Sequence, residues 1–148
     1  MNELEALAQG YQQFGSTSAV IGGLAFAAAT AILATGAGST DRKTLSRTAI
    51  VTVGAATASA ASLVFASVVW AFLNVQAVRA AAQAATLDES VRTLNRPASL
   101  AFILGFGLFF VAVGASGWIG SRSLGVFTSI VAALGGVGGL LLILRFAA

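Results

Sequence analysis

Cysteine and histidine are both absent from the 148 residues of the chain. The lack of cysteine excludes disulfides, thiolate metal sites and thiol nucleophiles. The lack of histidine removes the commonest general base and the commonest metal ligand. Acidic groups are also scarce, because the sequence has five Asp and Glu residues in total. We therefore expect no enzymatic activity, no catalytic residues, no metal site and no cofactor.

Charged residues of either sign are rare. They make up 9% of the chain, whereas a soluble domain has about 25%. With 57% hydrophobic residues, the chain is too apolar to cover a soluble surface, and the composition predicts an integral membrane protein. The eight Lys and Arg residues are scattered over connecting segments, which favours contact with lipid headgroups over nucleic-acid binding.

Four long apolar segments dominate the chain. Each is long enough to cross the hydrocarbon core of a bilayer as a helix, and none alternates polar and apolar residues as barrel strands do. They predict an all-α fold, an integral membrane four-helix bundle in which residues 1–148 form one domain. The second segment exceeds the bilayer thickness, so it tilts or projects into water. The expected spans are 17–37, 48–78, 97–119 and 124–144.

The segments between the spans are short and polar. Residues 1–15 predict a short amphipathic helix, which lies at the membrane interface or leads straight into the first span. Turns at 38–43 and 120–123 predict antiparallel hairpins, and 86–96 is the main polar break before Pro97, which suits the first turn of a helix. Basic residues divide equally between the two sides, so their distribution does not fix the orientation.

Small residues recur at steps of four within the spans. Such steps allow membrane helices to approach closely, and two interpretations follow. The strips pack the four helices of one subunit, or the strip of the first span packs against its own copies around a symmetry axis. The predicted helix-packing residues are Gly15, Ala19, Gly54, Ala58, Ser62, Gly135 and Gly139, and the first-span strip continues through Gly23, Ala27 and Ala31.

Large and polar side chains complete the pattern. We expect the phenylalanines of the third span, such as Phe102 and Phe106, to face lipid or the outer layer of the bundle. Trp70 and Trp118 are near span ends, where interfacial anchors lie. No ionisable residue lies in mid-span, which argues against a proton-coupled transporter. The carboxylates of Asp88 and Glu89 are expected in a solvated loop.

The first span resembles the pore helix of the Orai calcium channels over residues 17–25, Thr-Ser-Ala-Val-Ile-Gly-Gly-Leu-Ala. Four spans, a helical N-terminal lead-in and a long second helix are also similar. The resemblance implies a ring of subunits whose first helix lines a central pore. The chain departs from the family at Ala31, where an acidic residue would stand, and at Ser16, where inner-pore basic residues have no match. Calcium selectivity is therefore not implied. The implied pore-lining residues are Gly23, Leu24, Ala27 and Ala31.

Together these features predict a small oligomeric channel or pore-forming protein of the cell membrane, with the first span lining a central axis. The expected partners are the lipid bilayer, further copies of the chain and a partner membrane protein. The alternative is a non-catalytic accessory or assembly subunit of a larger membrane complex. A substrate transporter is disfavoured, because broken helices and polar groups at mid-membrane are missing.

Overall fold

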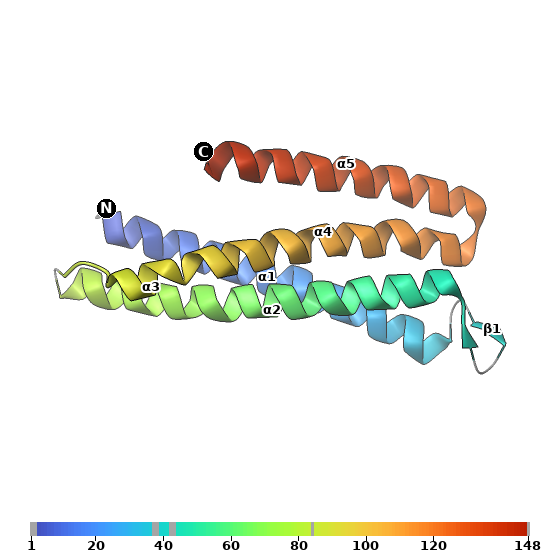
Figure 1. The fold of residues 1–148 in the computed structure, drawn as a ribbon, viewed down its shortest axis with the longest axis horizontal. Helices are drawn as coiled ribbons and strands as arrows, with labels where there is room; N and C mark the ends of the chain where they lie inside the picture. Colours follow the sequence, from blue (N-terminus) through green and yellow to red (C-terminus); the bar gives the residue numbers. More distant parts are fainter. Residues whose placement is uncertain (1–2, 37–38, 42–43, 84, 148) are drawn as a thin grey trace.

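Long helices account for most of the chain in the computed structural model (Figure 1), which describes all residues except 1–2, 37–38, 42–43, 84 and 148. Two short strands and the five-residue helix α3 connect the long helices. The elements are α1 (Glu3–Thr35), β1 (Ser39–Asp41), β2 (Thr44–Leu45), α2 (Arg47–Ala82), α3 (Glu89–Thr93), α4 (Asn95–Gly120) and α5 (Arg122–Ala147).

Four helices in the described part of the chain are long and apolar enough to cross a membrane. The predicted all-helical class and the four helices are therefore confirmed. Helices α2, α4 and α5 each contain one predicted span, whereas α1 ends at Thr35, before the predicted end of the first span at 37. The expected turn 38–43 falls partly outside the described residues. Its described part forms β1, which pairs antiparallel with β2.

The N-terminal segment is not a separate helix, because α1 runs without a break from Glu3 into the first span. Of the two expected arrangements, the structure has the direct lead-in. With 33 and 36 residues, α1 and α2 measure about 50 and 54 Å, whereas the bilayer core is about 30 Å thick. The start of α1 and the end of α2 therefore extend together beyond the apolar segments. There the Asn74 amide donates to the carbonyl of Ala8 at 3.1 Å.

The four long helices pack one beside the next, in the order α1, α2, α4, α5, and do not form a closed bundle. Helix α2 packs extensively against both α1 and α4, α5 packs against α4, and α1 touches α4 only slightly. Figure 1 shows α5 running alongside α4, whereas α1 crosses behind α4 and α2. The four-helix bundle is thus open, with α1 and α5 at its two edges.

The core lies where α1, α2 and α4 meet. Trp70 is 3% exposed and packs between Phe14 and Phe102 in tilted ring contacts, at centroid distances of 5.3 and 5.4 Å. Its indole N–H donates to the Asn95 side chain at 3.0 Å. The prediction of Trp70 as an interfacial anchor is wrong, because the ring faces the neighbouring helices. Phe102, 7% exposed, is likewise buried and does not face lipid.

Glycine allows α4 to approach both of its neighbours. A Cβ at Gly105 would lie 2.7 Å from Leu63 Cγ on α2. On α5, a Cβ at Gly135 or Gly139 would meet the rings of Phe110 and Phe106. These phenylalanine rings therefore fill the contact between α4 and α5 instead of forming a lipid-facing layer.

Candidate functional site

Helix α1 has one face turned toward α2. Gly15 lies on this inner face, where an added Cβ would be 3.7 Å from Trp70 Cβ. A Cβ at Gly22 would lie 3.2 Å from Leu63 Cβ, which shows how closely the two backbones approach. The buried residues of the face are Ala8, Gly15, Ser18, Gly22, Ala25 and Ala29. Of the strip predicted at steps of four, only Gly15 belongs to this face.

The four predicted pore-lining residues lie together on the opposite, exposed face of α1. Leu24 is 58% exposed, and Gly23, Ala27 and Ala31 are also exposed. A Cβ added at Gly23 would meet nothing within 4 Å. The structure therefore leaves these residues available to a partner outside the chain.

A longer pattern runs along this exposed face. Its spacing alternates between four and three residues, a mean period of 3.5 that keeps one helix face toward a partner helix. The residues predicted at a regular step of four do not follow this face, because a step of four drifts slowly around the helix. We name these residues the outer strip: Gln9, Gln13, Ser16, Val20, Gly23, Ala27, Thr30 and Ala34, all exposed.

The outer strip is poor in large apolar side chains. Among its eight residues only Val20 is large and apolar, at 63% exposure. The hydroxyl of Thr30 donates to the carbonyl of Ala27 at 2.9 Å, and that of Ser16 donates to Gln13 at 3.0 Å. Because each hydroxyl donates within its own helix, it can line an interface or a water-filled path without leaving its O–H donor unpaired.

Helix α5, at the other edge of the structure, differs sharply. Its exposed residues include Phe127 at 64% and Leu134 at 72%. Large apolar side chains of this kind suit contact with lipid tails, whereas glycine, alanine and hydroxyl groups suit close contact between helices. The outer strip of α1 therefore differs chemically from the exposed surface of α5.

The remaining predicted packing residues divide between inside and outside. Gly54 and Ala58 of α2 are exposed, and a Cβ at Gly54 would meet nothing within 4 Å. Ser62 lies at the contact with α4, where its Cβ is 3.1 Å from a Cβ added at Gly105. The hydroxyl of the neighbouring Ser59 donates to the Gly105 carbonyl at 2.7 Å in the buried contact.

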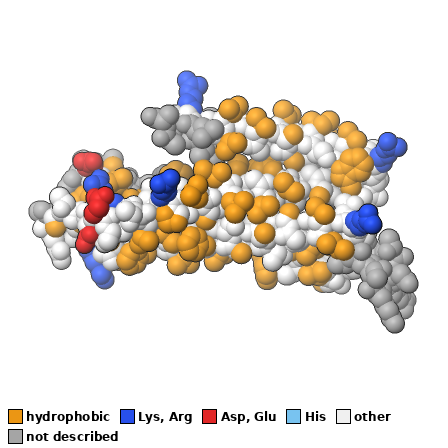
Figure 2. Space-filling model, viewed as in Figure 1, with side chains coloured by type: hydrophobic (Ala, Val, Ile, Leu, Met, Phe, Trp, Pro, Cys, Tyr) orange, Lys and Arg blue, Asp and Glu red, His pale blue; other side chains and the backbone are white. Residues whose placement is uncertain are grey.

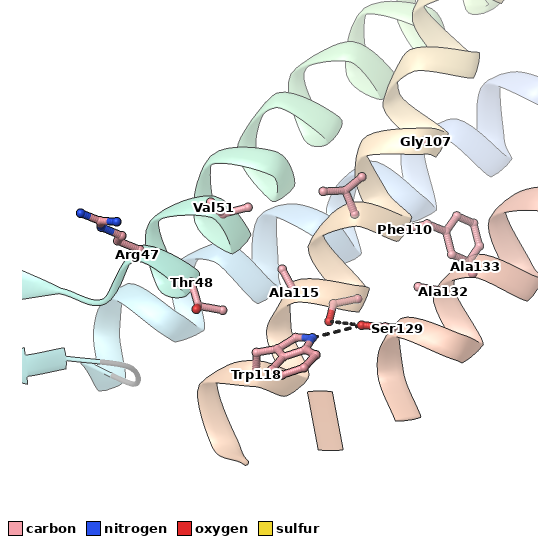
Figure 3. Close-up of a pocket in the computed structure, with 12 residues that line it drawn as sticks. Arg47, Thr48, Val51, Gly107, Phe110, Ala115, Trp118, Ser129, Ala132 and Ala133 are labelled. Carbon is pink, nitrogen blue, oxygen red and sulfur yellow. Dashed lines mark hydrogen bonds between the residues drawn. The ribbon is translucent and has the colours of Figure 1, made fainter. Parts of the chain in front are cut away.

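A groove of about 610 Å³ lies between the start of α2, the second half of α4 and the middle of α5 (Figure 3). Trp118, 46% exposed, borders it near the end of α4 and donates from its indole N–H to Ser129 of α5 at 3.1 Å. We call this groove the α2–α4–α5 groove. It is lined by Arg47, Thr48, Val51, Gly107, Phe110, Val111, Gly114, Ala115, Trp118, Ser129, Ala132 and Ala133.

The two ends of the molecule differ in charge. Acidic side chains gather at the end that holds α3 (Figure 2). There Asp88 caps α3, and hydrogen bonds from the backbone N–H and hydroxyl of Ser90 hold the pKa of Asp88 below its usual value. Arg47 and Arg122 begin α2 and α5 at the opposite end. Among the described residues, no three or more acidic side chains are grouped as metal ligands would be.

These features define the class of multi-pass helical membrane proteins, because four helices of the described chain are each long and apolar enough to cross a membrane once. Comparison with models of protein families, with curated protein sequences and with solved structures finds no match to this chain.

Proposed function

We propose that the chain is one subunit of an oligomeric channel in the cell membrane, with the outer strip of α1 around a central axis. The observation that carries the proposal is the contrast between the two edges of the structure. The outer strip of α1 exposes mainly small and hydroxylated residues, whereas α5 exposes large apolar residues such as Phe127 and Leu134. The large apolar residues that α1 also exposes, such as Leu24 and Phe26, lie outside the outer strip. A ring with α1 innermost and α5 outermost would place each edge in the environment that suits it.

In such a ring, side-chain size decides where the path is narrowest. Gly23 and Ala27 add little bulk, and Val20 and Leu24 are the larger apolar residues beside them. A ring of apolar side chains can gate a pore by dewetting. No ionisable side chain lies on α1 between Gly15 and Thr35, so selectivity for divalent cations is not part of the proposal.

The absence of cysteine makes the arrangement directly testable, because single cysteines can be introduced without background. Ala27→Cys places a thiol on the outer strip, and Leu134→Cys places one on the lipid-facing edge of α5. We expect oxidative cross-linking of Ala27→Cys into dimers, and little of Leu134→Cys. In liposomes, a water-soluble thiol reagent should reduce ion flux through Ala27→Cys and leave Leu134→Cys unchanged.

The alternative function, an accessory or assembly subunit, uses the same exposed strip differently. The strip would then pack against another polypeptide, as would the exposed Gly54 and Ala58 of α2. Cross-linking of Ala27→Cys in native membranes distinguishes the two: dimers of the chain favour the channel, and an adduct with a different protein favours the accessory subunit. Well-folded oligomers without ion flux in liposomes would exclude the channel.

A further inference from the structure

The α2–α4–α5 groove is hollow because of the residues that line it. Helix α5 packs on α4 and has no extensive contact with α2, so the space beside the start of α2 is lined largely by short side chains. A Cβ added at Gly107 would meet nothing within 4 Å. The volume of the groove, about 610 Å³, lies within the range of small-molecule sites.

The depth of the groove corresponds to one leaflet of a bilayer. Gly107 and Trp118 border it on α4, and they are separated by about 16 Å along the helix. The hydrocarbon core is about 30 Å thick, so this length is about half of it. The groove begins at the level of Arg47, at the start of α2, and extends toward mid-membrane.

The headgroup end of the groove is positive. Arg47 is exposed, lines the groove and points outward past its end (Figure 3). It stands in the first turn of α2, which contains no acidic residue, and a cation there is disfavoured by the helix dipole. Arg122 opens α5 at the same end, also without an acidic residue in the first turn. Neither arginine stabilises its own helix end, but both attract an anion.

We infer that the α2–α4–α5 groove retains an anionic glycerophospholipid, with one acyl chain between the helices and the headgroup phosphate at Arg47. The apolar lining suits an acyl chain, the length of the groove suits a chain that spans one leaflet, and the positive end suits the headgroup phosphate. The site lies on the α4 and α5 side of the molecule and does not depend on what α1 lines.

Native mass spectrometry of the detergent-purified chain tests this inference, with phosphatidylglycerol and phosphatidylcholine of identical acyl chains as probes. We expect the wild-type chain to bind phosphatidylglycerol more tightly. Arg47→Gln should weaken phosphatidylglycerol binding about fivefold, since one arginine near an anionic lipid contributes about that factor, and should leave phosphatidylcholine unchanged. Arg96→Gln, a first-turn arginine of α4 at the other end of the molecule, is the matched control.

Filling the groove tests the acyl-chain part separately. Gly107→Leu and Ala133→Leu should each reduce the retention of both lipids, and Gly138→Leu, where a Cβ also meets nothing within 4 Å, should not. Two filling variants guard against one that fails to fold. Equal binding of both lipids by the wild-type chain, or unchanged retention in the folded filling variants, would overturn the inference. So would displacement of the lipid by inorganic phosphate, or a changed oligomeric mass in Gly107→Leu, since that result assigns the groove to a second copy.

Discussion

At the scale of single residues, Gly105 determines how closely α2 and α4 approach. An added Cβ would lie 2.7 Å from Leu63 Cγ, and Leu63 is fully buried. The same approach brings the Gly105 carbonyl to the hydroxyl of Ser59. One backbone position thus supports both the packing and the buried hydrogen bond of this contact.

We predict that Gly105→Ala destabilises the protein by about 1–3 kcal/mol, because overpacking forces neighbouring side chains out of place. Gly107→Ala is the matched control. It lies two residues further along α4, where an added Cβ would meet nothing within 4 Å, so it should change stability little. Unfolding in mixed micelles, followed by circular dichroism, measures both. Equal stability of the two variants would show that the contact relaxes without cost.

Trp70 shows what sequence position alone cannot predict. Its place near a span end predicted an interfacial anchor, and its distance along α2 does match one bilayer thickness from Arg47. Which way the ring points depends on α1 and α4, since it packs against Phe14 and Phe102 and bonds to Asn95. Partners 25 or more residues away leave no local signal in the sequence around Trp70.

At the scale of helices and strands, the four long helices were predictable, because apolar runs in a chain with few charges have few other folds available in lipid. The ends of these helices were harder to predict. The sequence left open whether residues 1–15 form a separate helix, and the continuity of α1 depends on its contact with the end of α2, including the bond from Asn74 to Ala8. The outer strip was missed because its mean period of 3.5 differs from a regular step of four, and because Gln9 and Gln13 lie in this extension.

The short helix α3 owes its start to Asp88. The carboxylate accepts from the Ser90 backbone and hydroxyl, which lowers the pKa of Asp88. A depressed pKa means that the cap contributes fully above the usual pKa of an aspartate and is lost as the pH falls through the lowered value.

We predict that Ser90→Ala raises the pKa of Asp88 toward its usual value, because the hydroxyl hydrogen bond is removed while the backbone bond remains. Thr93→Ala is the control, since the Thr93 hydroxyl donates to the Ser90 carbonyl and not to Asp88. Titration of the Asp88 carboxyl by carbon-13 NMR in micelles measures the shift. If both variants titrate as the wild-type protein does, the hydroxyl has no part in the cap.

At the scale of the whole molecule, an even number of spans determines which ends lie together. Both termini and α3 share one end of the structure, and the starts of α2 and α5 share the other (Figure 1). If the four helices cross a bilayer, α3 and the turn between α4 and α5 must face opposite compartments. Glu89 and Ser123, both exposed, mark these two places.

We predict that Glu89→Cys and Ser123→Cys show opposite labelling in sealed vesicles by a membrane-impermeant maleimide. One variant should react before lysis and the other only after detergent is added, because charged reagents do not cross hydrocarbon. Val131→Cys in α5 is the control and should resist the reagent, since the apolar segment around it would lie within lipid. Simultaneous labelling of both exposed sites in intact vesicles would contradict the spanning arrangement, and with it the ring of α1 helices, because a central path requires helices that reach both faces of the membrane.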